Sequence, residues 1–480
     1  MRELAVTMQC PEEGRAVIDT TIGRIADYAL ATAFESIPGA VVHDCKRRLI
    51  DTFGCAVAGF DDAPSRIARH VALKGESRGA SILGTSRRVL PELACFANGV
   101  AARCMDGNDC FPGGGGHPSG VIAPVLAAGQ VTGADGCSLI AAIVVGYEVH
   151  YRVWQACRVL RKGFDHAFYS AVAAAAGVAK VLRLDRAAFA NAIALAITPN
   201  LPFAVTRRGA LSMWKGCAEA HAARNGLFAA ELAHAGMTGP ALAVEGAMGV
   251  RELFGPFELA AFANEGGLHA MPRADMKFYV TEYHSQGPIF AALQLRRDLD
   301  LDAVEAIEIH TYEFAYREIG SGAEKWRPLN RETADHSMPY IVAATLVDGG
   351  FSDAVFKPER FTDPKILALA DKISIREDPE FNRDFPGKFR CRVDITSSDG
   401  TVRSAGVDYP HGHHLDPMSD QEVEAKFRQL AARKLSAERL EAALTAFWNF
   451  DQARSADEIF QIVDIESVPT TRMEPSAISQ

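Results

Sequence analysis

The sequence predicts a mainly α-helical protein in which a large all-helical domain, formed by both termini, carries an inserted smaller α+β domain. Three observations predict this architecture. Ala-rich segments follow one another from residue 17 to about 270, alternating patterns appear only after about 270, and a helical pattern returns from Ser419. The chain has 480 residues, 48% of them hydrophobic and 23% charged, as expected for a folded chain of two or three domains.

The first part of the chain reads as consecutive helices. Ala-rich stretches at 169–182, 186–197 and 217–235 favour helix and close helix packing, and the cluster 132–136 is a turn. Ser419 precedes a segment with Val423, Phe427 and Leu430 at helical spacing, so the last part of the chain returns to the helical domain. A Rossmann domain is not predicted, because no strand–helix alternation occurs.

The middle of the chain has a different residue pattern, which predicts strands as well as helices. Segments 304–316 and 389–395 alternate and are rich in β-branched residues, and an Asp-Gly turn at 397–400 joins the latter to a strand at 401–407. Helices are expected at 339–347 and 364–373. The predicted boundaries are 1–271 and 412–480 for the helical domain and 272–411 for the α+β lid domain.

Composition excludes several function classes. The net charge is −10, so no basic field is expected to attract nucleic acid or an anionic membrane, and an anionic substrate would need a local basic site. The most apolar stretch, 139–149, is too short for a membrane span, and the first fifteen residues do not read as a signal peptide. Ten cysteines, Cys10 among them, form no CxxC pair. We therefore expect a cytoplasmic protein without a zinc ribbon or an iron–sulfur cluster.

A glycine loop is the first candidate for chemistry. Asp106 and Asp109 precede the four glycines 113–116, which lead to His117 and to a helix start that Ser119 is expected to cap. Backbone can approach a ligand closely there, and a helix start favours an anion. The alternative is a flexible surface loop with a solvated histidine. The loop matches neither GxGxxG nor the P-loop, so nucleotide binding is not predicted.

Other candidates lie further along the chain. His166 follows Asp165 and is either an oriented acid/base or a polar residue at a helix entrance. Arg207, Arg208 and Lys215 form either a carboxylate site or a solvated basic face.

The predicted domain junction supplies a cation and a potential acid/base, Lys277 and His284. Downstream, 335–340 opens a helix. His411, His413 and His414 share one loop without a carboxylate or cysteine partner, which predicts no metal site.

Taken together, these motifs resemble one family, the MmgE/PrpD group. The resemblance rests on the order and spacing of many short motifs over nearly the whole chain: Asp106-x-x-Asp109 followed by 117–120, 146–149, 214–216 followed by the helix at Gly226, Gly239, 245–249, 277–286, 335–340 and 363–365. It implies a helical domain with an α+β lid, an active site between them, a homodimer, and no metal or other cofactor.

The resemblance also implies roles for particular residues. The residues expected to bind carboxylates and move protons are Asp106, His117, His166, Lys215, Lys277 and His284. The residues expected to contact substrate are Asp109, Arg207, Ser119 and Gln286. Two positions depart from the family pattern: Cys110 replaces an expected Thr, and the tetraglycine replaces a bulkier loop, which suggests room for a larger or differently shaped acid.

The leading interpretation is a hydro-lyase that acts on a small tricarboxylate of the 2-methylcitrate or citrate type. Proton abstraction next to a carboxylate builds charge that fixed cations stabilise, and histidine suits that transfer near neutral pH. Three alternatives stay open: a decarboxylase of a cis-aconitate-like acid, an epimerase of the iminodisuccinate type, and a non-catalytic helical binding protein.

Overall fold

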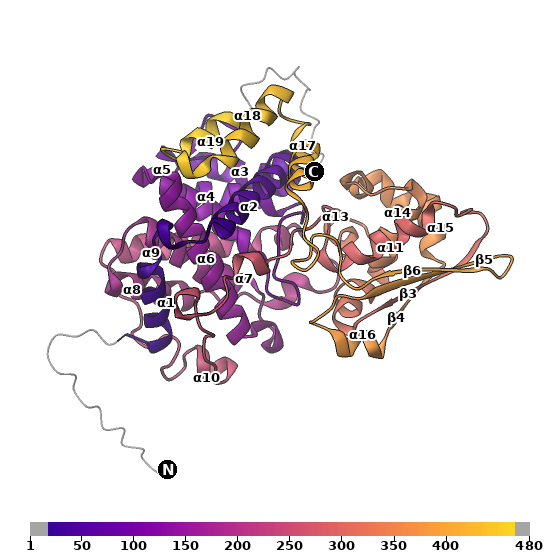
Figure 1. The fold of residues 1–480 in the computed structure, drawn as a ribbon, viewed down its shortest axis with the longest axis horizontal. Coiled ribbons are helices and arrows are strands. Elements are labelled where there is room, and N and C mark those ends of the chain that lie inside the picture. The colour runs from indigo at the N-terminus through magenta and orange to yellow at the C-terminus, as the bar shows by residue number, and fades with distance from the viewer. Residues whose placement is uncertain (1–17, 466–480) are drawn as a thin grey trace, which may run out of the picture.

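The computed structural model describes residues 18–465, so the expectations for the first fifteen residues and for Cys10 lie outside the described range. Figure 1 shows a large helical body beside a smaller body that contains a sheet. The predicted fold class is confirmed: the chain is mainly helical, with a small mixed sheet in its C-terminal half.

The helical body is built from both ends of the described chain. Its helices are α1 Thr20–Ala31, α2 Gly39–Ala58, α3 Ala63–Ala72, α4 Pro91–Arg103, α5 Ile122–Thr132, α6 Gly136–Ala156, α7 Ala167–Val181, α8 Arg186–Ile197, α9 Ala218–His234, α10 Val250–Phe254, α17 Asp420–Ala431, α18 Ala437–Trp448 and α19 Asp457–Ile462.

Small residues set the spacing of the central helices. In α7 every residue except Lys180 is buried, and a Cβ on Gly226 of α9 would lie 2.3 Å from the carbonyl oxygen of Ala171. These two helices therefore pack at a distance that only glycine at position 226 permits. This explains the Ala-rich composition from which the helices were predicted.

The C-terminal helices lie against the N-terminal ones, as the yellow and indigo ribbons in Figure 1 show. The Ser419 side chain caps α17, and Glu422 completes a capping box. Phe447 of α18 and Phe460 of α19 pack on Phe53 of α2, with ring centroids 5.0 Å and 5.8 Å away. This packing supports the proposal that the α+β domain is an insertion.

The smaller body contains a four-stranded sheet in the order β4-β3-β5-β6. β3 pairs in parallel with β4 and antiparallel with β5, and β5 pairs antiparallel with β6. Its elements are α11 Gln286–Arg296, β3 Val304–Thr311, α12 Glu313–Ala315, α13 Arg331–Ala334, α14 Met338–Asp348, α15 Pro364–Ala370, β4 Ile373–Glu377, α16 Pro379–Asp384, β5 Cys391–Ser397 and β6 Val402–Val407.

Two strand features depart from the sequence prediction. The expected helix 364–373 ends at Ala370, and Ile373 instead begins β4, a short strand whose weak alternation gave little signal beside the preceding helix. A two-stranded ribbon of β1 Glu76–Ser81 and β2 Arg88–Val89 lies within the region predicted as helix after helix. Its residues are mostly polar, so the alternating apolar pattern that marks a strand is missing.

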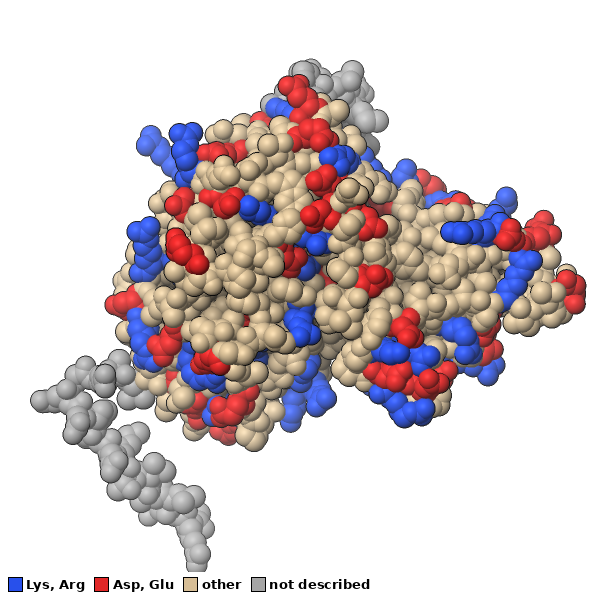
Figure 2. Space-filling model, in the orientation of Figure 1, with Lys and Arg blue, Asp and Glu red and all other residues tan. Residues whose placement is uncertain are grey.

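Two clusters of buried apolar side chains accompany the two bodies. One cluster runs from Ile22 to Met276 and from Met418 to Ile465, and the other from Tyr283 to Ile395 together with Cys110. The division supports the proposed boundaries near 272 and 411. No helix within residues 18–465 is long and apolar enough to cross a membrane. On the face shown in Figure 2, basic and acidic side chains are intermixed.

A buried lysine joins the C-terminal helices to the junction between the two bodies. Lys426 of α17 donates to a carboxylate oxygen of Asp51 at 2.6 Å and to the carbonyl oxygens of Gly107 and Lys277 at 2.7 Å and 2.6 Å. Both carbonyls belong to segments that also supply side chains to the cavity described below. The C-terminal helix thus helps to fix the position of those segments.

Replacing Lys426 with Met should lower the free energy of unfolding by about 3–5 kcal/mol, because Asp51 would remain buried without its partner. Urea unfolding followed by circular dichroism measures the change. Lys388→Met, which removes the exposed pair with Asp408, is the matched control and should leave the midpoint nearly unchanged. Equal midpoints for both variants would contradict the structural role of Lys426.

Candidate functional site

A cavity that is open to solvent lies between the two bodies and is lined by both; its empty space of about 690 Å³ includes solvent at its mouth. Its polar lining has four cations, three carboxyl groups and four histidines: Arg103, Arg207, Arg208, Lys277, Asp106, Glu282, Glu318, His117, His166, His284 and His336. The rest of the wall comes from residues 110–114, Gly116, Leu160, Ala204, Tyr283 and Phe314. Such a concentration of titratable groups in a cavity marks a functional site.

Asp106 is the centre of the charge network. Its carboxylate accepts from Arg103 at 2.7 Å and from Lys277 at 2.6 Å, and Lys215 lies 2.9 Å from its other oxygen. Burial would raise the pKa of Asp106, but the three cations hold it well below its usual range. An ionised carboxylate shared by three cations is a poor base and an effective anchor. Its backbone has φ 55°, a left-handed conformation that Asp tolerates better than most residues.

Arg103 and Glu219 orient two histidines. Arg103 donates to Nε2 of His117 at 2.6 Å, and Nδ1 of that ring donates to the Asp109 carbonyl at 2.7 Å. Arginine cannot accept, so His117 is neutral with its proton on Nδ1. Burial and the charge of Arg103 hold its pKa well below the ordinary value.

His166 has a different arrangement. Its Nδ1 lies 2.9 Å from Oε1 of Glu219, whose Oε2 accepts from Arg103 at 2.7 Å. No described residue makes a hydrogen bond to Nε2 of His166. Nδ1 makes no hydrogen bond with good geometry to a described residue, but the nearby negative charge of Glu219 favours a proton on Nδ1 and a lone pair on Nε2, which is the form required of a general base.

A second carboxylate–histidine pair comes from the smaller body. Nδ1 of His336 lies 2.7 Å from Asp335, and Lys215 binds the same carboxylate through both oxygens at 2.7 Å and 2.6 Å. Burial, with the charge of Lys215, lowers the pKa of His336 to about 3, so the ring is neutral. Lys215 thereby links Asp106 in the helical body to Asp335 in the smaller body.

The opposite wall carries Glu282 and His284. Nδ1 of His284 hydrogen-bonds to the Tyr312 hydroxyl, and its Nε2 lies 3.8 Å from Glu282. Burial, with the charge of Lys277, lowers the pKa of His284 to about 3. Burial raises the pKa of Glu282 to about 8.

The structure brings most of the predicted catalytic residues together. Asp106, His117, His166, Lys277 and His284 all line the cavity. The sixth, Lys215, lies behind Asp106 and is 1% exposed, so it holds carboxylates of the protein and does not face the cavity. The catalytic roles of these residues stay a proposal.

Of the four expected substrate contacts, only Arg207 lines the cavity, where it also pairs with Asp165 at 2.9 Å. Asp109 accepts from the Tyr147 hydroxyl at 2.7 Å and from the Ser119 amide at 3.1 Å, while Gln286 binds the Tyr279 backbone. Asp109, Ser119 and Gln286 do not line the cavity, so their placement does not support direct substrate contact.

The capping role expected of Ser119 is wrong. Ser119 lies inside the 3₁₀ turn Pro118–Val121, one turn before α5, and its hydroxyl accepts from Asn108 at 2.8 Å. Asp109 instead provides an acceptor at this turn through the Ser119 amide.

The tetraglycine is a tightly packed turn, and Gly113, Gly114 and Gly116 form part of the cavity wall. Gly113, Gly114 and Gly116 have positive φ, and a Cβ on Gly114 would lie 2.5 Å from Leu160. A Cβ on Gly116 would lie 2.7 Å from Nδ1 of His166 and 2.8 Å from Glu219. The glycines therefore allow the backbone to reach the His166–Glu219 pair, and the suggestion that they leave room for a larger acid stays a prediction.

Sequence reasoning missed Arg103, Glu219, Glu282 and the pair Asp335–His336 as site residues. Asp335 and His336 stood in a recognised motif but were read as a helix start. Arg103 and Glu219 lie on Ala-rich helices, where a charged residue is expected to lie on the solvent-exposed face. Only the crossing of α4 and α9 places both of them inside the protein.

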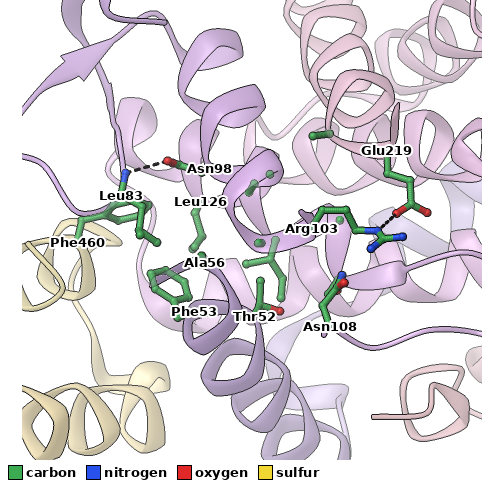
Figure 3. A pocket seen from close by; sticks show the side chains of 17 residues that line it. Thr52, Phe53, Ala56, Leu83, Asn98, Arg103, Asn108, Leu126, Glu219 and Phe460 are labelled. Atoms are coloured by element: carbon green, nitrogen blue, oxygen red, sulfur yellow. Dashed lines mark hydrogen bonds and ion pairs between the residues drawn. The ribbon is translucent and has the colours of Figure 1, made fainter. Parts of the chain in front are cut away.

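A second cavity, of about 530 Å³, lies inside the helical body and shares Arg103 with the first (Figure 3). Its wall is largely apolar, with Phe53, Leu126 and Phe460 facing the Arg103–Glu219 pair. The histidines are absent from its described lining, so the chemistry lies on the other side of Arg103.

Three clusters of described side chains have the spacing of metal ligands, with donor atoms within 4.8 Å of one another. They are His117–His166–Glu219, Asp106–Asp335–His336 and Asp275–His413–His414. The first two lie among Arg103, Lys215 and Lys277, whose charges oppose a divalent cation.

The third cluster corrects the expectation for the histidine loop. His411 is not part of it, because it pairs with Asp416 and Glu422, whereas His413 and His414 gain Asp275 as a carboxylate partner. Nδ1 of His413 accepts the Leu415 amide, so its Nε2 carries the proton and has no lone pair for a metal. The donor sets therefore fit a metal poorly.

The protein thus has a helical body, a smaller α+β body and a cavity of titratable groups between them. Comparison with known sequences identifies its family. Residues 23–260 match the MmgE/PrpD N-terminal domain, and residues 279–452 match the MmgE/PrpD C-terminal domain. The chain belongs to the MmgE/PrpD family.

Its relatives include lyases that catalyse two different reactions. A 2-methylcitrate dehydratase from Cupriavidus necator is 28% identical over 93% of this chain and 95% of the relative. A cis-aconitate decarboxylase from Mus musculus is 23% identical over 92% of each chain. A 2-methylcitrate dehydratase from Escherichia coli strain K12 is 27% identical over 84% of this chain and 87% of the relative.

Incubation with EDTA or with excess Zn²⁺ should shift the thermal unfolding midpoint by less than about 1 °C, because a ligand stabilises a fold only where it binds. Differential scanning fluorimetry of the purified protein measures the shift. A rise of several degrees with Zn²⁺ that EDTA reverses would contradict the electrostatic argument against a metal. The three clusters named above would then be the sites to mutate.

Proposed function

We propose that this protein is a hydro-lyase that removes water from a small tricarboxylate of the 2-methylcitrate or citrate type. The observation that carries the proposal is the cavity between the two bodies, where four cations and four histidines meet. In the structure each of these cations is already paired with a carboxylate of the protein: Arg103 and Lys277 with Asp106, Arg207 with Asp165, and Arg208 with Glu318. A substrate carboxylate therefore binds by exchanging with one of these partners, most readily at Arg208, whose pair with Glu318 is the most exposed of them.

In this proposal His166 removes the proton next to a substrate carboxylate. His166 lines the cavity, no described residue makes a hydrogen bond to its Nε2, and the negative charge of Glu219 beside Nδ1 would stabilise the imidazolium that forms. Lys277 and the guanidinium groups of Arg207 and Arg208 are placed to stabilise the charge that develops on the carboxylate. Asp106 and Lys215 position these groups and do not touch the substrate.

Decarboxylation of a cis-aconitate-like acid is the second candidate, favoured by the decarboxylases among the relatives. Both reactions need the same cations and pass through similar charge on a carboxylate. A non-catalytic binding protein accounts for the cations but leaves the carboxylate–histidine pairs without a role.

We also propose a homodimer in the cytoplasm. Exposed apolar side chains on 237–268, including Met248 at 92% and Leu268 at 65%, offer a surface for a second copy. A monomeric mass in light scattering would contradict the proposed homodimer.

The proposed location rests on the cysteines. The nine cysteines among the described residues are all unpaired, as in a reducing compartment.

The function is tested by incubating the protein with 2-methylcitrate, citrate, cis-aconitate and iminodisuccinate. We expect 2-methylcitrate or citrate to give an unsaturated product, seen by ultraviolet absorbance, without release of carbon dioxide. Carbon dioxide from cis-aconitate would establish the second candidate. A change in optical rotation with neither product would make the protein an epimerase and overturn both.

His166→Gln should lower kcat by roughly 10²–10⁴-fold, the usual contribution of a general base, with little change in KM. His234→Gln, the same substitution at an exposed position of α9, is the control. Steady-state kinetics and the melting temperature measure both variants. Full activity in His166→Gln would exclude His166 as the base and make His336 and His284, whose Nε2 atoms also make no hydrogen bond with a described residue, the next candidates.

A further inference from the structure

Glu282 is a carboxyl group that the network described above does not use. It precedes the 3₁₀ turn Tyr283–Ser285, lines the cavity and is 9% exposed. Its Oε2 is buried and makes no hydrogen bond with any described residue, and Oε1 lies 3.8 Å from Nε2 of His284. A carboxylate oxygen that is buried without a hydrogen-bond donor is costly to ionise, so the position of Oε2 favours the neutral acid.

The surroundings act in the same direction. Burial raises the pKa of Glu282 to about 8 and Asp106 adds to the rise, whereas Lys277 and a hydrogen bond from the backbone amide of His284 oppose it. Lys277 is 2.6 Å from Asp106, so its charge is already matched by another carboxylate. The titratable groups that act on Glu282 from neighbouring segments are Asp106, Lys277, His284, Tyr312, Glu318 and Lys325.

The other titratable groups of the cavity are poor proton donors. His117, His284 and His336 are neutral near pH 7, and a neutral imidazole gives up its proton far less readily than a carboxylic acid. Asp106 is already ionised. Among the described carboxyl groups and neutral histidines of the lining, Glu282 is thus the group best suited to give a proton to a substrate.

We propose that Glu282 is the general acid of this site and protonates the hydroxyl group that leaves a hydroxy polycarboxylate. The inference rests on the proposed function. Nε2 of His166 takes the proton from the carbon next to a carboxylate, and the electron pair left behind forms the carbon–carbon double bond as the carbon–oxygen bond breaks. The departing oxygen takes the proton of Glu282 and leaves as water. Glu282 is then a carboxylate and His166 an imidazolium, and solvent returns the proton from His166 to Glu282.

The test compares Glu282→Gln and Glu282→Asp with the unmodified protein. Gln keeps the size and neutrality of the acid but has no proton to transfer, so kcat for the hydroxy acid should fall roughly 10²–10⁴-fold, with KM within about threefold. Asp should recover part of the activity. For the unmodified protein kcat should fall as pH rises through about 8, because the acid loses its proton, and this limb should be missing in Glu282→Gln.

A substrate analogue separates acid catalysis from a structural role. When fluoride replaces the leaving hydroxyl, no proton is needed for departure, so Glu282→Gln should eliminate fluoride within about threefold of the unmodified rate. Glu305→Gln, on an exposed position of β3, is the control.

Two results would overturn the role of Glu282: undiminished elimination of the hydroxyl group in Glu282→Gln, or equal loss with the hydroxy and fluoro substrates. Failure of the proposed function looks different, because the unmodified protein itself would then release no water from any acid tested.

Discussion

The arrangement of the site depends on one buried carboxylate, that of Asp106. Arg103, Lys215 and Lys277 come from three separate segments and meet within 2.9 Å of its two oxygens. Three cations at this distance would repel one another without the central charge, and little water is present to screen them. The three cations lie on α4, on the turn Met213–Gly216 and on the segment 277–286. The negative charge of Asp106 therefore allows these three segments to lie next to one another.

The same network decides the protonation states of the histidines. Burial and neighbouring cations favour neutral rings at His117, His284 and His336. His166 differs in its surroundings, because the carboxylate of Glu219 and not a cation lies nearest its Nδ1. The base role proposed for His166 rests on this difference. Lys215 has a different role from the one its residue type suggests. Lysine is suited to bind a substrate carboxylate, but the ammonium group of Lys215 is bound by the protein's own carboxylates, Asp106 and Asp335.

Sequence patterns predicted the parts of the fold that have strong periodicity. α8 has the predicted bounds, and the strand pair around the Asp-Gly turn appears as β5 and β6. β4 was missed because its five residues follow a helix and pair in parallel with β3, which is distant in the sequence. Local residue spacing does not indicate such a long-range pairing.

The site was predicted unevenly for a related reason. Histidines and lysines beside glycines or at the predicted domain junction, such as His117 and Lys277, could be recognised as candidates in the sequence. Arg103 and Glu219 were not, because on one helix each resembles a solvated charge, and only the packing of α4 on α9 buries both. Ser119 and Gln286 show the converse: they stand inside suggestive motifs, yet the Ser119 side chain binds the Asn108 side chain and Gln286 binds the Tyr279 backbone.

The rim of the cavity is built differently from its base. Arg208 of the helical body and Glu318 of the smaller body meet at 2.9 Å, with side chains 49% and 21% exposed, and both line the cavity. Exposed pairs contribute little to stability, whereas separating Lys215 from Asp106 or Asp335 would leave buried charges without partners. The least costly way to admit a polycarboxylate is therefore to open the rim, where Arg208 can exchange Glu318 for a substrate carboxylate while the Asp106 network remains in place.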